Sequence, residues 1–492
     1  MRTRTRRRLP LPPGPKKLPF LGNTFSMPTS SEWEVFDRWC KEYDTDIIHL
    51  DVAGTSIVVL NTVEAATELL DNRSAIYSSR PRMTMVNELM GWDFSFGLME
   101  YGMWRSQRRL FQQEFNPVAV ERYHQCELKA THELLRRLLD NPNKFIEHIR
   151  HLAGSTILSI AYGLEVLPEN DPYILAAEAG LYSLAKAAVP GAFLVDSIPL
   201  LKYIPDWFPG ATFKRKAKEW RQYSKTMREM PFEAAKRRIA EGTAAPSYTS
   251  YSLEKLDHER DAASEECRIQ STAATMYTGK SSTVSVLCTF ILAMLANPEA
   301  QRRAQEEIDV VLGPGELPRF VDENSLPFVS AVVKEVLRWK NVTPMGIPHA
   351  LTAEDVYQGY NIPSGSTVIA NIWAMLHDET TYPEPHSFRP ERFMKEGKLN
   401  PDIRDPDTVL FGFGRRICPA RYMAHSSIWI AIVSMLAVFD ITKTVDEFGN
   451  TIEPTYAYAN ALACVPLPFK CSLKPRSTIA EASIRATING DA

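Results

Sequence analysis

The chain has 492 residues, of which 45% are hydrophobic and 23% charged, and its formal net charge is −3. This length and composition indicate a large buried core and exclude a chain that is disordered over most of its length. The near-neutral charge gives no general attraction to nucleic acid, so we expect no nucleic-acid partner. The seven cysteines are scattered, with no Cys-x-x-Cys pair and no histidines gathered near them. We therefore expect neither a zinc site nor a disulfide framework, and favour a reducing compartment.

Five of the first eight residues are arginine, and a proline-rich stretch from Leu9 to Pro15 follows them. No apolar run of 18 or more residues occurs in the chain, so we expect neither a membrane span nor a secretory signal. Residues 1–23 are predicted to be a basic stub and a proline-rich hinge. Such a basic run is typical of a solvated tail, and it would also hold the chain against anionic lipid.

The pattern along the rest of the chain predicts a mainly α fold with small β-sheets. Two β-branched runs, Ile47–Val52 and Ser56–Leu60, flank Gly54 and predict a hairpin. From about 62 to 340 the pattern is mostly helical, with 3.6-residue periodicity around 120–140, 174–188, 212–240, 268–296 and 326–340. Residues 241–265 are predicted to be an exposed linker, 342–368 short strands and turns, 420–439 an apolar helix, and 464–473 a strand. Residues 474–492 form a polar tail that we expect to be disordered.

Cys418 lies in the segment Phe-Gly-Phe-Gly-Arg-Arg-Ile-Cys-Pro-Ala, between a glycine-rich bend and the apolar helix. Free backbone N–H groups and the positive end of the helix dipole would favour a thiolate there. Gly412 and Gly414 let the backbone turn sharply and lie flat against a planar ligand. Arg416 offers a cationic fork to a carboxylate. A thiolate beside such an arginine is suited to haem iron, although the bare pattern is as often a buried structural cysteine.

This segment resembles the haem-binding signature of the cytochrome P-450 family of haem-thiolate monooxygenases. Phe411, Gly414, Arg416 and Cys418 stand in the signature positions, and Ala420 replaces the usual final glycine. The resemblance implies the cytochrome P-450 fold, with a single haem-binding domain at residues 24–473. It also implies haem b as the cofactor and Cys418 as the ligand of its iron.

Glu335 and Arg338 stand three residues apart on a predicted helix, and Arg392 follows in a proline-bounded loop. Taken alone, such a pair is usually an exposed ion pair of little energetic value. In the resembled family, a Glu-x-x-Arg helix and a Pro-Glu-Arg-Phe loop form a buried charge triad beneath the haem. The resemblance assigns these three residues to that triad.

Trp104 and Arg108, one helical turn apart, match the family's Trp-x-x-x-Arg, and His349 matches a further contact of the haem propionates. Taken alone, His349 would be a turn-capping histidine. The segments 85–92 and 207–216 are similar to fungal members of secondary-metabolite pathways. The resemblance extends from the proline-rich hinge to Leu473.

The predicted central helix departs from the family pattern at Thr278-Gly-Lys-Ser-Ser-Thr283. Ser281 stands where the family has an acid and Ser282 where it has threonine, two groups that relay protons to iron-bound dioxygen. A serine-bound water would replace the acid if hydroxylation is ordinary. The alternatives to ordinary hydroxylation are uncoupled oxygen use, a peroxide-driven reaction or a rearrangement without oxygenation. Lys280 projects about 200° from Ser282 and is expected to face away from the haem.

The resemblance implies oxidation of an apolar or aromatic small molecule by O₂, in fungal secondary metabolism. NADPH–cytochrome P-450 reductase would supply the electrons to a monomeric enzyme. Substrate contacts are expected from 84–100, 178–213, Ala274, Thr278, 342–346 and 458–462, which suit an apolar pocket. The location would be the cytosolic face of the endoplasmic reticulum if an anchor is missing from this sequence, and otherwise cytoplasmic or peripheral.

Two other functions remain open from the sequence. The first is a haem-thiolate isomerase, dehydratase or peroxygenase, because the acid of the usual proton relay is absent. The second is a haem-binding sensor or carrier without turnover, against which the complete charge triad argues.

Overall fold

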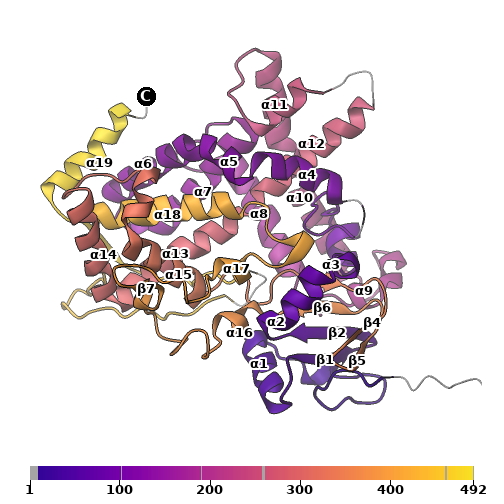
Figure 1. Ribbon diagram of the computed structural model, residues 1–492. Helices are drawn as coiled ribbons and strands as arrows, with labels where there is room; N and C mark the ends of the chain where they lie inside the picture. The colour runs from indigo at the N-terminus through magenta and orange to yellow at the C-terminus, as the bar shows by residue number, and fades with distance from the viewer. Residues whose placement is uncertain are drawn as a thin grey trace, which may run out of the picture.

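Helices make up most of the molecule (Figure 1). The computed structural model describes residues 9–100, 102, 104–189, 191–256, 261–459 and 463–490. The α-helices are α1 (Glu32–Glu42), α2 (Val63–Ala66), α3 (Ser74–Tyr77), α4 (Trp104–Glu114), α5 (Pro117–Val120), α6 (His124–Asp140), α7 (Phe145–Tyr162), α8 (Pro172–Ala187), α9 (Leu194–Ser197), α10 (Thr212–Ala240), α11 (Tyr248–Glu254), α12 (Ala262–Tyr277), α13 (Lys280–Ala296), α14 (Pro298–Val311), α15 (Pro327–Trp339), α16 (Ile372–Leu376), α17 (Asp407–Leu410), α18 (Arg421–Val438) and α19 (Thr478–Gly490).

The strands are β1 (Ile47–Val52), β2 (Thr55–Leu60), β3 (His349–Ala350), β4 (Asp355–Tyr357), β5 (Tyr360–Ile362), β6 (Thr367–Ala370), β7 (Met394–Lys395), β8 (Lys398–Leu399), β9 (Phe439–Thr442) and β10 (Ser472–Pro475). Four of them form one sheet in the order β1-β2-β6-β3, and the others form two-stranded pairs. Strands β1, β2, β4, β5 and β6 lie together at one side of the molecule, apart from β7 (Figure 1). The predicted hairpin is confirmed, since β1 and β2 pair antiparallel from Ile47 opposite Leu60 to Val52 opposite Thr55.

Two helices that are apolar on every side, α13 and α18, lie at the centre of the core. A helix without a polar face is stable in a folded protein only when neighbours cover it all round. Helices α6, α13, α14 and α15 pack against α18. By length and composition, Ala262–Ala296 and Arg421–Val438 could each cross a membrane, but 72% of the apolar window of each is buried within the fold. Packing in the core therefore accounts for their apolar character.

The structure differs from the predicted linker at 241–265. Ser247 forms a capping box with Ser250, which begins α11 inside the predicted linker. Tyr248 and Thr249 are buried, and the Thr249 hydroxyl donates to the Ala161 carbonyl of α7 at 2.7 Å. These short polar residues resemble a linker by composition but cap and anchor a helix. Residues 257–260 lie outside the described residues.

The C-terminal segment also differs from its prediction, because α19 replaces the expected disordered tail. Ala480 and Ile484 are buried against the core, and Arg136 of α6 donates to the Thr487 hydroxyl at 2.6 Å. Apolar residues four apart thus bury one stripe of an otherwise polar helix. The strand expected at 464–473 is shorter and later, since only Ser472–Pro475 pairs with β9.

The proline-rich stretch is fixed to the sheet. The Pro13 carbonyl accepts from the His49 N–H at 2.8 Å, and the Asn23 side chain accepts from the Asp51 N–H at 2.9 Å. A Cβ at Gly14 would lie 2.4 Å from the His49 carbonyl oxygen, so only glycine allows this close approach. The basic stub, residues 1–8, lies outside the described residues, and the division of the chain at residues 23 and 473 stays a prediction.

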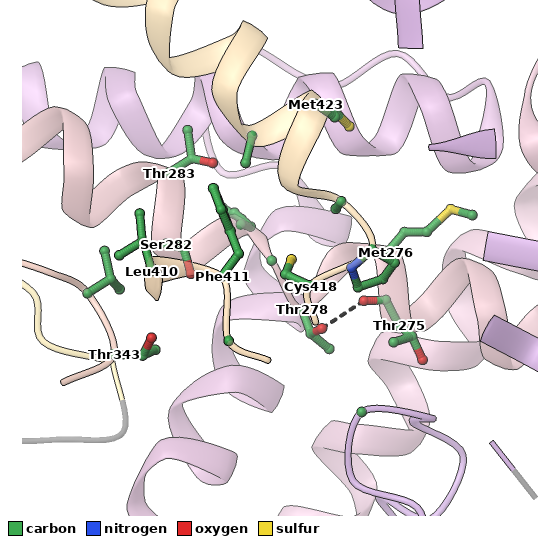
Figure 2. Close-up of a pocket in the computed structure, with 18 of the residues that line it drawn as sticks. Thr275, Met276, Thr278, Ser282, Thr283, Thr343, Leu410, Phe411, Cys418 and Met423 are labelled. Atoms are coloured by element: carbon green, nitrogen blue, oxygen red, sulfur yellow. Dashed lines mark hydrogen bonds between the residues drawn. The ribbon is translucent and has the colours of Figure 1, made fainter. Parts of the chain in front are cut away.

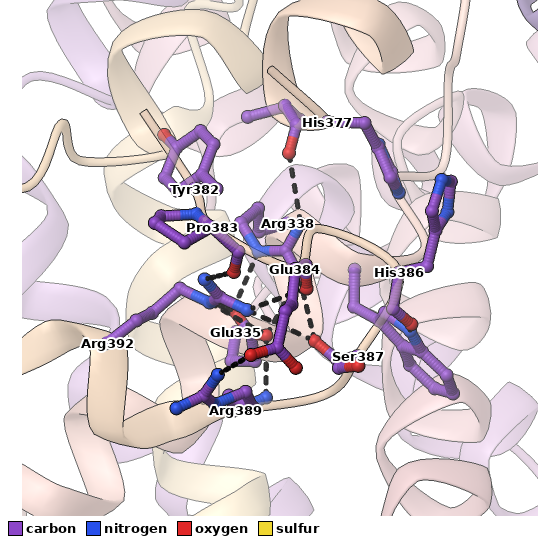
Figure 3. Close-up of polar contacts among 12 residues, drawn as sticks. Glu335, Arg338, His377, Tyr382, Pro383, Glu384, His386, Ser387, Arg389 and Arg392 are labelled. Atoms are coloured by element: carbon purple, nitrogen blue, oxygen red, sulfur yellow. Dashed lines mark hydrogen bonds and ion pairs between the residues drawn. The ribbon is translucent and has the colours of Figure 1, made fainter. Parts of the chain in front are cut away.

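A buried charge cluster joins α15 to the turn Pro390–Phe393 (Figure 3). The two carboxylate oxygens of Glu335 accept from Arg338 at 2.7 and 2.8 Å, and Arg392 donates to the same carboxylate at 3.2 Å. Glu335 and Arg338 are completely buried. The Arg389 backbone N–H adds a fourth contact to Glu335 at 2.8 Å. The three residues that the resemblance assigns to a charge triad are therefore together.

Replacing Arg338 by alanine is expected to lower the free energy of unfolding by about 3–5 kcal/mol, because it removes a main partner of a buried carboxylate. Thermal or urea unfolding of the purified variant measures this loss. The matched control is Arg302→Ala, which removes an ion pair in which the arginine is 56% exposed. The control is expected to unfold close to the wild-type midpoint. Equal losses in both variants would show that burial does not set the strength of the Arg338 pair.

Candidate active site

A cavity of about 370 Å³ lies where α12 and α13 face the loop before α18 (Figure 2). Its wall includes Thr275, Met276, Thr278, Ser282 and Thr283 from the two helices and their junction, Leu410, Phe411 and Cys418 around the loop, and Met423 from α18. Of the expected substrate segments, 84–100 contributes Phe96 and Gly97, and 342–346 contributes Val342, Thr343 and Gly346. The described residues of 178–213 and 458–459 do not line this cavity, nor does Ala274. Residues 460–462 lie outside the described residues.

The loop that carries Cys418 is held by its own backbone. The Cys418 N–H donates to the Phe411 carbonyl at 2.8 Å, which closes the loop at its base. Gly412 and Gly414 both have positive φ, 78° and 60°. Gly412 lines the cavity, whereas a Cβ at Gly414 would lie 2.0 Å from the Leu70 carbonyl oxygen. Gly414 is therefore required by packing against Leu70, and it is not part of the cavity wall.

Burial raises the pKa of the Cys418 thiol. The Ala420 N–H and the charges of Arg108 and Arg421 act in the opposite direction, as the sequence led us to expect, but burial is the largest effect. A bound metal cation favours deprotonation of a thiol far more strongly than these groups do. A metal bound at this site would therefore convert the Cys418 thiol to a thiolate.

Arg416 is buried at the base of the cavity, and all its donors are directed to backbone carbonyls. It donates to the carbonyls of Ser78, Phe96 and Met99 at 2.8, 2.7 and 2.6 Å. Its guanidinium also lies 4.1 Å from the ring centroid of Trp104, a cation–π contact. The cationic fork predicted from the sequence is present, and carbonyl dipoles hold it in place.

Two further arginines line the same cavity. Arg80 donates to the carbonyls of Gly97, Ile347 and Pro348 at 2.8–2.9 Å. Arg108 donates to the Ile417 carbonyl at 2.5 Å. Burial lowers the pKa of all three guanidinium groups, and the charge of Arg80 lowers that of Arg416 further. Neither Arg80 nor Arg416 has a carboxylate among its hydrogen-bond partners in the described part of the chain.

Arg80 is the site residue that sequence reasoning missed. It stands in Ser78-Ser-Arg-Pro81, a short irregular segment without periodicity and without a nearby charge partner. The only local signal is an arginine before a proline, between two serines and a second arginine. The contacts to Gly97 and to the 347–348 carbonyls join segments far apart in the chain, so no local pattern predicts them.

His349 completes the polar wall of the cavity. Its Nδ1 donates to the Tyr77 carbonyl at 2.7 Å, which leaves Nε2 as the ring nitrogen available to a ligand. Burial, with the charge of Arg80, holds the imidazole pKa well below its ordinary value, so the ring is neutral. The nearby Trp104 indole N–H is buried without a hydrogen-bond partner.

These donors fit a planar iron cofactor that carries two carboxylates. Three buried cations line the cavity and call for an anion, and haem b has two propionates. Cys418 would supply the sulfur ligand in the same cavity. Arg108, His349 and Arg416, three of the predicted cofactor residues, line it together with Phe411. Trp104 does not line the cavity, but its ring contacts Arg416.

The long central helix is interrupted above this site. Helix α12 ends at Tyr277, and the N–H groups of Thr278 and Gly279 donate to carbonyls only three residues back, at 3.1 and 3.4 Å. The Thr278 hydroxyl also donates to the Thr275 carbonyl at 2.7 Å. A glycine with low helix propensity and a threonine that bonds the backbone together explain the interruption. The continuous helix expected at 268–296 is therefore two helices.

The two serines of the predicted proton relay have different surroundings. Ser282 lines the cavity, as does Thr283, but Ser281 does not. Lys280 is buried, and its ammonium reaches Glu178 of α8 at 3.4 Å and lies over the Tyr277 ring. Its charge is thus paired with Glu178 of α8, but Lys280 also lines the cavity, so it does not face wholly away from the cofactor site as expected. Hydroxyl groups alone replace the acid on this part of the helix.

Comparisons with known proteins agree with this geometry. Residues 12–470 match the family model described as cytochrome P450. The chain is 48% identical to cytochrome P450 monooxygenase 98 of Postia placenta over 486 residues, which cover 98% of this chain and 93% of that protein. It is 48% identical to cytochrome P450 monooxygenase ple1 of Rhodocybe pseudopiperita, with 97% and 91% covered. It is 44% identical to tryptamine 4-monooxygenase of Psilocybe cyanescens, with 96% and 94% covered.

These matches extend over nearly the whole chain, and they confirm the fold class and the haem-thiolate character that the Cys418 segment predicts. All three of these relatives are fungal monooxygenases. The chain therefore belongs to the cytochrome P450 family, as an oxidoreductase of the monooxygenase class.

Proposed function

We propose that this enzyme oxidises an apolar or aromatic small molecule in fungal secondary metabolism, as a monomer that receives electrons from NADPH–cytochrome P450 reductase. The observation that carries the proposal is a single cavity in which Cys418 and three buried arginines meet walls of Phe, Leu, Ile, Val and Met. Most of the cavity wall is apolar, which favours an apolar substrate. One relative is named for action on tryptamine, an aromatic amine, which supports the substrate class without naming the compound.

The residues of the chain divide the work of the site. Cys418 would bind the iron through sulfur, and the charges of Arg80, Arg108 and Arg416 would offset those of the two cofactor carboxylates. When bound, haem supplies the activation of O₂ with electrons from the reductase. The apolar wall excludes bulk water, and the hydroxyl groups of Ser282 and Thr283 hold and pass protons at the cavity surface.

The function is tested by product analysis under ¹⁸O₂ with a panel of apolar and aromatic compounds. Compounds are first selected by the shift of the ferric haem to high spin when they bind. Transfer of one labelled oxygen to the product supports the proposal. A product without label would instead favour the isomerase, dehydratase or peroxygenase interpretation.

We also propose that the enzyme rests on the cytosolic face of the endoplasmic reticulum. Four large apolar side chains in and after α9 are strongly exposed, namely Leu194 (71%), Leu200 (74%), Tyr203 (73%) and Trp207 (80%). Exposed basic residues, Arg215, Lys216 and Lys218, follow at the start of α10. An apolar patch next to cations suits the interface of an anionic membrane.

Leu200→Ser combined with Trp207→Ser is expected to lower the fraction of enzyme that sediments with anionic phospholipid vesicles, because it removes apolar area from the interface. The matched control is Val118→Ser on α5, which removes a side chain that is 80% exposed elsewhere. Co-sedimentation measures both variants. Equal binding by the wild type and the double variant would contradict the proposed membrane surface.

Cys418→Ser is expected to abolish the Soret band that thiolate-ligated haem shows in the reduced carbon monoxide complex. The reason is that an oxygen donor pushes far less electron density to iron. The exposed thiol of Cys267 provides the control, and Cys267→Ser should keep the band. If Cys418→Ser kept the thiolate-type spectrum, the ligand assignment and the proposed function would both fail.

Ser282→Ala is expected to raise the amount of hydrogen peroxide released per NADPH consumed. The rate at which O₂ is converted to water or product should fall by about 100-fold, the usual contribution of general-acid catalysis. Ser281→Ala is the control, because Ser281 does not line the cavity. Both are measured with purified reductase, NADPH and peroxide detection. Identical behaviour of the two variants would show that the Ser282 hydroxyl has no part in proton delivery.

A further inference from the structure

A buried carboxyl group that the proposed reaction does not use opens onto the same cavity as Cys418 and Ser282. Glu127 lies on α6 and is only 2% exposed. Glutamate is rarely buried to this extent unless a cation or a metal compensates its charge. The helix around Ser281, where the family pattern has an acid, carries none. The carboxyl group of Glu127 therefore has no role assigned so far.

Only one of the two side-chain oxygens of Glu127 has hydrogen-bond partners among the described residues. Its Oε1 accepts from the hydroxyl groups of Ser426, at 2.9 Å, and Ser427, both on α18. Its Oε2 is buried with no hydrogen-bond partner. Because Oε1 already accepts two hydrogen bonds, a proton on this carboxyl group resides on Oε2. Oε2 is then an unpaired donor at the wall of a cavity.

The surroundings of Glu127 keep that proton in place near neutral pH. Burial raises the pKa of the carboxyl to about 8, and only the two serine hydroxyls oppose the effect. Lys280 of α13 lines the same cavity, but its ammonium is paired with Glu178, and no charged side chain contributes to the shift. The neighbouring titratable group on α6 is the Cys126 thiol, whose own pKa burial raises. The raised pKa, about 8, favours the protonated form of Glu127 at neutral pH.

Hydroxyl groups line the cavity beside this acid. Ser427 of α18 and Thr131 of α6 stand at its wall, as does Thr156 of α7. Thr283 and Ser282 of α13 line the same cavity. A polar wall of this kind can hold ordered water that bridges the hydroxyls, and such bridges conduct protons.

We propose that Glu127 supplies protons to the reduction of O₂ in this enzyme, from Oε2 through water held at the cavity wall to the hydroxyls of Ser282 and Thr283. The inference rests on the proposed function, whose balance is substrate C–H, O₂, NADPH and one H⁺ giving substrate C–OH, H₂O and NADP⁺. Glu127 releases one proton into the hydroxyl chain and regains one from solvent, so it is unchanged over the cycle. It acts through these hydroxyls and does not touch the reacting atoms.

A purely structural role is the rival explanation, since Oε1 joins α6 to α18 through two serines. Glu127→Gln distinguishes the structural role from proton delivery, because glutamine keeps the size and the acceptor oxygen but cannot release a proton. Glu127→Asp keeps the acid. The control is Glu121→Gln, which changes an exposed glutamate just before α6.

The first measurement needs no turnover. Infrared difference spectra of the ferric holoenzyme between pH 6 and pH 10 should show one protonated carboxyl band that is lost with a midpoint near pH 8. The band should be absent in Glu127→Gln and present in Glu121→Gln. A wild-type enzyme without such a band would overturn the proposal, because its carboxyl would be ionised throughout.

The second measurement compares, with reductase present, how much hydrogen peroxide and how much water form per NADPH consumed. In the wild type, peroxide per NADPH should rise as pH rises through about 8, since the carboxyl then has no proton to give. Glu127→Gln should release peroxide at a high level at every pH, with water formation lowered by about 100-fold. Glu127→Asp should restore the pH dependence. If Glu127→Gln released the same peroxide per NADPH as the wild type, with the same pH midpoint, the role of Glu127 would be structural only and the inference would be overturned.

If Glu127→Gln yields little holoenzyme, Ser427→Ala takes its place. It keeps the acid and the Ser426 contact but removes one of the two hydroxyls that lower the pKa of the carboxyl, so the midpoints of the infrared band and of the peroxide rise should both move to higher pH. A band that moves while the peroxide midpoint stays in place would overturn the proposal. A wild type that consumes no O₂ with reductase overturns the proposed function as well, whereas O₂ consumption that is independent of Glu127 overturns this inference alone.

Discussion

The rest of this structure depends on three buried guanidinium groups that lack enough negative charge around them. Arg80, Arg108 and Arg416 come from different parts of the chain, and backbone carbonyls hold their donors. Carbonyl dipoles offset only part of the cost of burying a cation. Binding of an anionic cofactor would offset the remainder, which would link cofactor affinity to folding stability.

Buried charge is treated in three distinct ways within one molecule. At Glu335, two arginines surround a carboxylate that is fully satisfied, and the result is a rigid joint between α15 and the 390–393 turn. At the cofactor end of the cavity, cations outnumber anions, which suits a ligand with two carboxylates. At Glu127 the charge is avoided altogether, because burial favours the protonated acid. The first arrangement serves the fold, and the other two serve chemistry.

Much of the fold could be predicted from the sequence because its signals are local. The β1–β2 hairpin follows from β-branched runs around Gly54, and helix α18 follows from an apolar run of the right length. The predictions failed where composition and structure disagree. Polar residues at 247–250 cap a helix instead of forming a linker, and a few apolar residues in the tail are enough to fix α19 on the core.

The candidate site was predictable to the extent that its residues lie in short motifs. Cys418, Arg416 and the Glu335–Arg338 pair have fixed spacings, so the sequence alone indicates their roles. Arg80 and Glu127 have no such pattern, because their neighbours in space are distant in the chain. Gly414 has the expected motif position, but its reason is the Leu70 carbonyl and not the cavity. Tertiary contacts of this kind are the part that local patterns leave out.

The central position of α18 has a consequence for the order of events during synthesis. Its residues, Arg421–Val438, leave the ribosome after those of α6, α13, α14 and α15, yet they form the middle of the core against which these helices pack. Until then, the apolar surface of α13 has no cover on that side and is exposed to aggregation. Cys418 emerges just ahead of α18. Closure of the core and delivery of the metal ligand are therefore one late step, and a nascent chain stalled before residue 438 can neither finish folding nor retain a cofactor.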